Sequence, residues 1–212
     1  MDYLTAIILG LVQGLTEFLP ISSSAHVSIV GQLLGQEDPG AAFTAITQLG
    51  TELAVVIYFW NDITTIIRKW FLALAGKVSQ DNPDVHMGWL VIIGTIPIGL
   101  LGLLFQDQIE STLRSLWITA TMLLVFALVI MAAERVGTQR RELTDLTWKH
   151  GILYGLWQAL ALIPGVSRSA ATMTAGLLRG FDRVTVTQLS FLLSVPVLAA
   201  AGALQAVTEA PR

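Results

Sequence analysis

The sequence contains no cysteine and few charged residues. The absence of cysteine excludes a disulfide framework, a thiolate metal site and a cysteine nucleophile. Charged residues make up only 13% of the 212 residues, and the formal net charge is −3. Proteins that bind nucleic acid usually carry a clustered basic face, so we expect no nucleic-acid partner.

Apolar residues, in contrast, are abundant: 54% of the chain is hydrophobic and the mean hydropathy is +0.69. A soluble core of this size cannot hide so much apolar surface. Four segments approach the roughly 20 apolar residues that a bilayer requires, and they are residues 42–60, 89–105, 116–133 and 189–207. An amphipathic stretch, residues 63–75, is expected along the membrane interface. The sequence therefore predicts an all-α integral membrane protein, a polytopic helix bundle surrounded by membrane lipids.

Two further apolar regions, residues 4–35 and 152–180, are interrupted in the middle. The first break reads Pro20-Ile-Ser-Ser-Ser24, and the second reads Pro164-Gly-Val-Ser-Arg-Ser169. Each half is too short to cross a bilayer alone. Non-helical backbone at membrane depth is tolerated only where it lines a protein-enclosed or watery cavity. We therefore predict two re-entrant pairs of broken helices, with the functional site at the breaks.

The two interrupted regions are copies of each other at a constant offset of 145 residues. Glutamine and serine recur as well as apolar residues, so shared hydrophobicity does not explain the match. The ten matched pairs are Gly10/Gly155, Leu11/Leu156, Gln13/Gln158, Leu15/Leu160, Ser22/Ser167, Ser24/Ser169, Ala25/Ala170, Gly31/Gly176, Leu33/Leu178 and Gly35/Gly180. We predict a single transmembrane domain over residues 1–212, with repeat one at about 1–133 and repeat two at about 146–212.

The distribution of charge predicts how the two repeats are oriented. If the first interrupted region enters from outside and the second from inside, one side holds Arg68, Lys69, Lys77, Arg135, Arg140, Arg141, Lys149, Arg179 and Arg183. The other side holds Asp2, Glu37, Asp38, Asp107 and Glu110, with Arg114 and Arg212. The positive-inside rule favours this arrangement, which makes the repeats inverted. Substrates of such folds bind near the midplane, at facing ends of broken helices. By the same symmetry, we expect repeat two to lack about two helices.

The first break gathers candidate catalytic groups. Gln13 and Glu17 are four residues apart and share one face of a helix. A carboxylate inside a membrane costs roughly 2.5 to 3.5 kcal/mol on insertion scales, so Glu17 is a functional candidate. The alternative is a carboxylate that snorkels to the interface.

Three serines and a histidine follow Pro20. They precede a half-helix whose unpaired N–H groups and positive dipole end favour an anion, and they are Ser22, Ser23, Ser24 and His26. The histidine is within reach of a serine hydroxyl as an acid or base. The alternative is a histidine with a purely structural role.

The second break adds a cation. Ser167 and Ser169 flank Arg168, whose planar guanidinium matches phosphate oxygens. An unpaired arginine at membrane depth is very costly, so Arg168 must pair with Glu17 or with a bound anion. Thr172 adds a hydroxyl one turn further on.

Glu52, in the span at residues 42–60, is open to three interpretations. Its carboxylate lines the cavity, neutralises a cation, or bonds a helix terminus across the repeat interface.

These residues resemble a known family. The segment Gln13-Gly-Leu-Thr-Glu17-Phe-Leu-Pro-Ile-Ser-Ser-Ser-Ala-His26 resembles the (E/Q)xxxE motif and serine-rich break of the undecaprenyl-pyrophosphate phosphatases of the bacitracin-resistance type. The segment Pro164-Gly-Val-Ser-Arg-Ser-Ala-Ala-Thr172 resembles their second signature, PGxSRSxxT. The resemblance extends over essentially all of the chain.

The resemblance implies hydrolysis of undecaprenyl pyrophosphate to undecaprenyl phosphate and inorganic phosphate. This reaction recycles the lipid carrier of peptidoglycan synthesis and confers bacitracin resistance. The family also implies the bacterial cytoplasmic (inner) membrane, an active site facing the periplasm or exterior, and a divalent cation, Mg²⁺ or Ca²⁺.

Site roles carried over from the family fall on the residues already singled out. Ser23 would be the nucleophile and His26 the acid or base, while Glu17 and Gln13 would support the nucleophile or hold the cation. Arg168 would hold the phosphates. Further donors to the pyrophosphate would be Ser22, Ser24, Ser167, Ser169 and Thr172.

Two other functions compete with this interpretation. A transporter or flippase of an anionic lipid or solute commonly has inverted repeats with broken helices, although transport requires no nucleophile beside an arginine. A noncatalytic scaffold, whose serines only cap helices, would tolerate loss of Arg168. A homodimer is one option for the oligomeric state. The reaction could pass through a phosphoserine intermediate or through direct attack by water.

Overall fold

The computed structural model describes residues 2–35, 41–110, 113 and 115–208, with side chains except at 41, 42, 44, 45, 110 and 201–208. Within these residues the fold is helical, with one isolated β-bridge between Arg141 and Phe181. The α-helices are α1 (Tyr3–Glu17), α2 (Ser23–Leu33), α3 (Ala41–Tyr58), α4 (Trp60–Leu74), α5 (Pro83–Leu104), α6 (Gln106–Glu110), α7 (Leu116–Val136), α8 (Trp148–Ala159), α9 (Arg168–Leu178) and α10 (Arg183–Thr208). Two short 3₁₀ turns are η2 (Leu143–Asp145) and η3 (Leu160–Leu162).

Three helices of the described chain are long and apolar enough to cross a membrane: α5, α7 and α10. Two shorter apolar helices are Tyr3–Glu17 and Ile46–Tyr58, the second of which lies in the predicted span at residues 42–60. Leu124, Leu128 and other large side chains of α7 are exposed, as a lipid-facing helix requires. The prediction of an all-α membrane protein is therefore confirmed.

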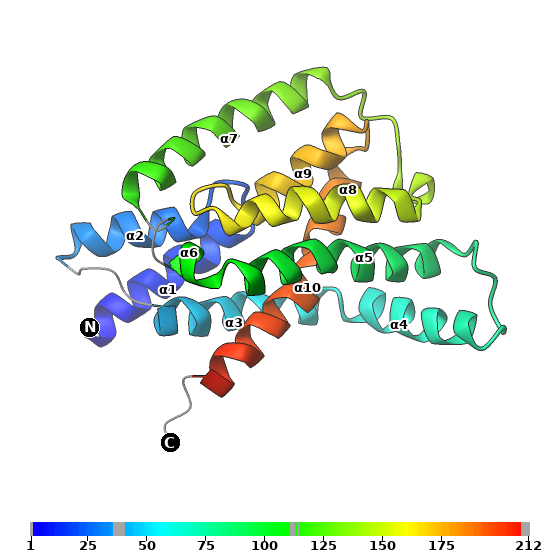
Figure 1. Ribbon diagram of the computed structural model, residues 1–212, viewed down its shortest axis with the longest axis horizontal. Coiled ribbons are helices and arrows are strands. Elements are labelled where there is room, and N and C mark those ends of the chain that lie inside the picture. Colours follow the sequence, from blue (N-terminus) through cyan, green and yellow to red (C-terminus); the bar gives the residue numbers. More distant parts are fainter. Residues whose placement is uncertain (1, 36–40, 111–112, 114, 209–212) are drawn as a thin grey trace.

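Each interrupted region forms two short helices separated by a break. Figure 1 shows α1 and α2 entering from the end of the molecule that carries the N-terminus and turning back towards it. The α8–α9 pair enters from the opposite end and turns back in the same way (Figure 1). The two breaks touch, because the Ser169 hydroxyl donates to the Leu19 carbonyl at 3.3 Å.

The backbone of the two breaks repeats as the sequence does. Ser22 has a φ of 66° and its counterpart Ser167 has a φ of 64°. Each serine hydroxyl contacts the hydroxyl two residues on, at 3.2 Å in the first break and 3.0 Å in the second. A residue other than glycine in this conformation is strained, and such strain clusters at functional sites. The strained conformation is therefore present at Ser22 and at Ser167, the matching positions of the two breaks.

The lysine and arginine residues of the described loops gather at one end of the molecule. Figure 1 places the α4–α5 connection, residues 137–147 and the α9–α10 turn at one end, which carries Lys77, Arg140, Arg141 and Arg179. The opposite end carries the N-terminus, where Asp2 accepts from the Thr5 backbone N–H at 2.7 Å, a bond that lowers the pKa of Asp2. Glu37, Asp38, Arg114 and Arg212 lie outside the described residues.

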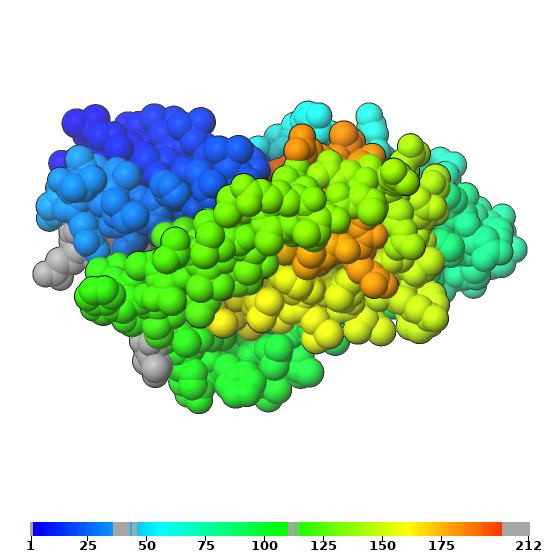
Figure 2. Space-filling view, turned by 90° about the horizontal axis from the view of Figure 1, so that it is seen from above, coloured from blue at the N-terminus to red at the C-terminus, as the bar shows by residue number. Residues whose placement is uncertain are grey.

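Helix α9 lies at the centre of the fold. Its residues from Ser169 to Leu177 are all buried, and they are mostly Ala, Thr, Ser and Gly, which let neighbouring helices approach closely. Helices α7, α8 and α10 pack on α9, and Figure 2 shows α7 crossing over this face of the molecule. Helix α9, which begins at the second break, is therefore enclosed by other helices.

The contact between α5 and α8 depends on glycine. A Cβ at Gly155 would lie 2.9 Å from the Gly94 carbonyl oxygen and 2.9 Å from Pro97. At Gly10, the counterpart of Gly155 in the first repeat, a Cβ would meet nothing within 4 Å. The same sequence position is therefore a close helix contact in one repeat and an open surface in the other.

We predict that Gly155→Ala lowers the free energy of unfolding by about 1 to 3 kcal/mol, because the α5 and α8 backbones must separate. Gly10→Ala is the matched control and should be neutral or slightly stabilising, since alanine favours helix. Thermal unfolding of the detergent-purified proteins compares the two. Equal melting temperatures would contradict the close α5–α8 contact.

Candidate active site

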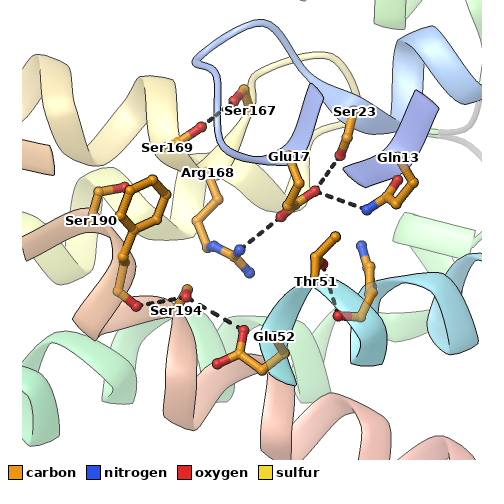
Figure 3. A network of polar contacts seen from close by, with 12 residues as sticks. Gln13, Glu17, Ser23, Thr51, Glu52, Ser167, Arg168, Ser169, Ser190 and Ser194 are labelled. Atoms are coloured by element: carbon orange, nitrogen blue, oxygen red, sulfur yellow. Dashed lines mark hydrogen bonds and ion pairs between the residues drawn. The ribbon is translucent and has the colours of Figure 1, made fainter. Parts of the chain in front are cut away.

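Glu17, the last residue of α1, joins the two breaks. Its Oε2 accepts hydrogen bonds from Gln13 Nε2 at 3.0 Å and from the Ser23 hydroxyl (Figure 3). Its Oε1 accepts from Arg168 Nη2 at 2.9 Å. The side chains of Arg168 and Glu17 are only 16% and 13% exposed. One carboxylate therefore holds groups from α1, α2 and α9 in a largely dry environment.

Local structure explains why these groups converge. Gln13 and Glu17 lie one helical turn apart on α1 and point to the same side. Ser23 is the first residue of α2, and Arg168 is the first residue of α9. Both follow a serine with positive φ, so the repeat places a hydroxyl and a guanidinium at equivalent positions. The N-terminal N–H groups of both helices accompany them, which favours an anion.

The other serines hold the breaks in shape. The Ser167 hydroxyl caps α9 by accepting from the Ala170 N–H at 3.3 Å. Ser22 occupies the equivalent N-cap position of α2, but its side chain makes no capping bond and contacts Ser24 instead. Ser169 bonds across to the first break. These predicted pyrophosphate ligands are therefore at the breaks, with their roles as ligands still predictions.

Thr172 lies apart from the other predicted ligands. Its hydroxyl donates to the Ser190 hydroxyl at 2.8 Å and contacts the Arg168 carbonyl at 2.9 Å. The side chain is fully buried between α9 and α10. In this structure Thr172 links two helices, one of which carries Arg168.

His26 contacts the backbone of the first break. Its Nδ1 lies 2.9 Å from the Ser22 carbonyl oxygen. A carbonyl oxygen can only accept, so Nδ1 is the donor in this contact. Among the described residues, the Ser23 hydroxyl pairs with Glu17 and not with His26. The acid or base role of His26 stays a prediction.

Glu17 and Arg168 line a cavity of about 10 Å³ between α1, α3, α9 and α10. This is about the room that one water molecule needs. The other polar lining residues are Thr51, Glu52, Ser169, Ser190 and Ser194. Of the three interpretations of Glu52, the structure supports the first: its carboxyl group, in a side chain only 6% exposed, lines the cavity. In the sequence, Glu52 was recognisable as a candidate because a carboxylate is rare inside an apolar span.

A larger groove of about 780 Å³ adjoins this cavity. The two spaces share Phe18, Val55 and Phe191 as walls. Phe18 and Phe191 pack edge to face, with ring centroids 5.7 Å apart. The groove is mainly apolar, with Asp62 and Arg183 also on its wall.

The donors available to a metal ion are few. Among the described residues, no group of three or more His, Asp or Glu side chains is arranged to hold one. Near the first break, Glu17 and Gln13 supply a carboxylate and an amide oxygen. Such a pair suits Mg²⁺, which is commonly bound by one or two carboxylates together with substrate phosphates.

Together, the fold and this site define a polytopic helical membrane protein whose buried charges meet where two broken helices face each other. The family model of the bacitracin resistance protein BacA matches residues 6–211, and the chain belongs to this family.

Similar proteins come from several bacteria. A relative from Pseudarthrobacter chlorophenolicus is 64% identical over 97% of this chain and 74% of its own length. Relatives from Micrococcus luteus and Bifidobacterium adolescentis are 61% and 50% identical, over 95% and 98% of this chain and 73% and 74% of their own lengths. All three are named undecaprenyl-diphosphatase.

We predict that Arg168→Met lowers the free energy of unfolding by roughly 3 kcal/mol, because Glu17 is left as a buried charge without a cation. The double variant Glu17→Gln, Arg168→Met should recover most of this loss, since neither charge is then present. Thermal unfolding in detergent measures both. The single variant Glu17→Gln completes the comparison. If the loss of unfolding free energy in the double variant equals the sum of the losses in the two single variants, the two charges do not interact.

Proposed function

We propose that this chain is a phosphatase that hydrolyses undecaprenyl pyrophosphate to undecaprenyl phosphate and inorganic phosphate, which recycles the carrier for peptidoglycan synthesis and confers bacitracin resistance. The observation that carries the proposal is the contact of Ser23 and Arg168 with one carboxylate, Glu17, at the N-termini of two helices. Membership of the BacA family supports it, as do relatives named undecaprenyl-diphosphatase.

In the reaction we propose, the Ser23 hydroxyl attacks the terminal phosphorus of the substrate. Its proton passes to Glu17 Oε2, to which it already donates. The bond between the terminal phosphorus and the bridging oxygen breaks, and undecaprenyl phosphate leaves. Water then hydrolyses the phosphoserine, which releases inorganic phosphate and restores Ser23. His26 Nε2 supplies or accepts a proton in these steps. If water attacks directly instead, Ser23 and Glu17 orient it.

Arg168 and the two helix N-termini stabilise the transferred phosphoryl group. The guanidinium presents paired N–H donors that match phosphate oxygens, and Ser22, Ser24, Ser167 and Ser169 add hydroxyl groups at the same breaks. A terminal phosphate that replaces Glu17 as the partner of Arg168 would free Glu17 to take the proton of Ser23. Arg168 therefore exchanges Glu17 for the phosphate, and Glu17 is neutralised by the proton of Ser23, so neither charge is left without a partner.

A divalent cation, Mg²⁺ or Ca²⁺, fits beside this arrangement. Glu17 would hold it, and the phosphates of the substrate would complete its ligands. Gln13 would join them through its amide oxygen only after the amide turns over, because its Nε2 faces Glu17 in this structure. When bound, the cation neutralises part of the charge of the pyrophosphate. Glu17 and Gln13 also orient Ser23 through the hydrogen bonds described above.

The finer architecture is part of the same proposal. We infer that α1–α2 and α8–α9 are re-entrant pairs and that the repeats, about 1–133 and 146–212, are inverted in the bacterial cytoplasmic membrane. The matching break geometry and the gathering of basic loops at one end support this. The active site then faces the periplasm or exterior. A homodimer stays compatible with this arrangement.

A transporter of an anionic lipid is the second candidate. The observation that makes it a candidate is the large groove that shares Phe18, Val55 and Phe191 with the polar cavity. The groove offers room for isoprenoid units of a lipid tail, which both functions require. Transport without hydrolysis, in liposomes with the lipid in one leaflet, would favour the transporter.

We predict that the detergent-purified protein releases inorganic phosphate from undecaprenyl pyrophosphate in the presence of Mg²⁺ or Ca²⁺, and that EDTA suppresses the release. Ser23→Ala should lower the rate at least about 100-fold, because the attacking hydroxyl is lost. Arg168→Lys should lower it roughly tenfold or more, since an ammonium lacks the bidentate fork. A colorimetric phosphate assay measures all of these rates.

Ser28→Ala, on the same helix, and Arg140→Lys, in a distant loop, are the matched controls and should retain the wild-type rate. Thermal unfolding checks that each variant is folded. Full activity of folded Ser23→Ala would remove Ser23 from the mechanism, and an inert but lipid-binding wild type would favour the transporter.

A further inference from the structure

Glu52 has no role in the reaction described above, although it is an unusual residue in its place. It lies in α3 within an apolar stretch, and its side chain is only 6% exposed. Its Oε2 accepts a long hydrogen bond of 3.5 Å from the Ser194 hydroxyl. Its Oε1 has no hydrogen-bond partner among the described residues. A buried carboxyl oxygen without a partner is costly, so a ligand for it is expected.

The opposite wall of the cavity has donors to spare. Arg168 carries five N–H donors on its guanidinium. In the described part of the chain, the hydrogen bond that this side chain makes goes to Glu17. Figure 3 shows Arg168 entering from α9 and Glu52 from α3, on opposite sides of the same small region. An excess donor and an excess acceptor therefore line one cavity.

The size of the cavity suits one water molecule. Its volume of about 10 Å³ is near the minimum that a water requires, and two to four polar partners must surround it. Glu52 Oε1, the Ser194 hydroxyl and the Arg168 guanidinium supply them. A metal ion fits poorly here, because Arg168 already brings a positive charge to the cavity.

We propose that Glu52 is a positioning residue for Arg168 and acts through one water molecule held between them. The proposal rests on the phosphatase function proposed above. In the resting site, Glu17 and Glu52 share the guanidinium. When the terminal phosphate displaces Glu17, the water-linked Glu52 keeps the guanidinium in the orientation that the transition state needs. Glu52 itself does not touch the substrate.

This role has two opposed consequences. A carboxylate that holds Arg168 competes with an incoming anion, so removing it should strengthen binding of pyrophosphate. The same removal leaves the guanidinium less well oriented, so it should slow turnover. A purely structural role predicts weakened binding and slowed turnover together. The opposite signs therefore distinguish positioning from structural damage.

The experiment compares Glu52→Leu and Glu52→Gln with wild type. Both variants remove a buried carboxyl group from an apolar helix, so we expect both to fold, and thermal unfolding checks this. For Glu52→Leu we expect kcat to fall about tenfold and the Kd for inorganic pyrophosphate, measured by calorimetry, to fall about threefold. Glu52→Gln should lie between, because its amide oxygen still accepts from the water. Asp81→Asn, an exposed carboxylate in the α4–α5 connection far from the site, is the control and should change neither value.

A second set of variants ties the effect to Arg168. In an Arg168→Lys background, Glu52→Leu should change kcat less than twofold and leave the Kd for pyrophosphate unchanged, since the held group is gone. Equal effects in both backgrounds, or weaker pyrophosphate binding by Glu52→Leu, would overturn the proposal.

The calorimetric measurement separates this proposal from the phosphatase function. If wild type releases no phosphate yet Glu52→Leu tightens pyrophosphate binding only when Arg168 is present, the phosphatase proposal fails and the link between Glu52 and Arg168 stands. If wild type releases phosphate from the lipid but Glu52→Leu does not change pyrophosphate binding, or wild type does not bind pyrophosphate at all, the phosphatase proposal stands and the proposal for Glu52 is wrong.

Discussion

The ion pair between Glu17 and Arg168 is the contact on which the site depends. Both charges are largely buried, and each would be very costly alone at membrane depth. Their 2.9 Å contact requires that the ends of α1 and α9 meet, so the two chain breaks must face each other. Everything that the breaks carry, including Ser23 and the free N–H groups of two helices, is thereby brought to one place.

A repeated sequence produces two different chemical groups at equivalent positions. Ser23 and Arg168 each begin a helix after a serine with positive φ, and the matching geometry allows the two side chains to approach Glu17 from opposite sides. The glutamines of the repeat have also diverged. Gln13 donates to the Glu17 carboxylate, whereas its counterpart Gln158 donates to the Gly94 carbonyl at 3.1 Å and holds α8 against α5. One copy serves the site and the other serves packing.

Much of this arrangement could be predicted from sequence, because it depends on local signals. Hydropathy located the three spanning helices of the described chain, whereas the predicted span at residues 42–60 contains a shorter apolar helix, Ile46–Tyr58. Pro and Ser located the breaks, and the cost of a buried guanidinium predicted a partner for Arg168. The start of α5 was predicted too late, at residue 89, because α5 begins with Pro83 after an Asn82 cap within a polar stretch. The contacts of His26, Thr172 and Glu52 were not predictable. Each depends on which backbone carbonyl or distant helix lies opposite, and spacing along one helix does not contain that information.

The most direct test of this account is a structure of the protein with methylenediphosphonate, a pyrophosphate analogue that is not hydrolysed. The account predicts a phosphonate group between the N-termini of α2 and α9, within hydrogen-bond distance of the Arg168 guanidinium, with Ser23 still bonded to Glu17. A phosphonate bound elsewhere, such as beside Arg183 in the large groove, with the Glu17–Arg168 pair intact, would contradict it.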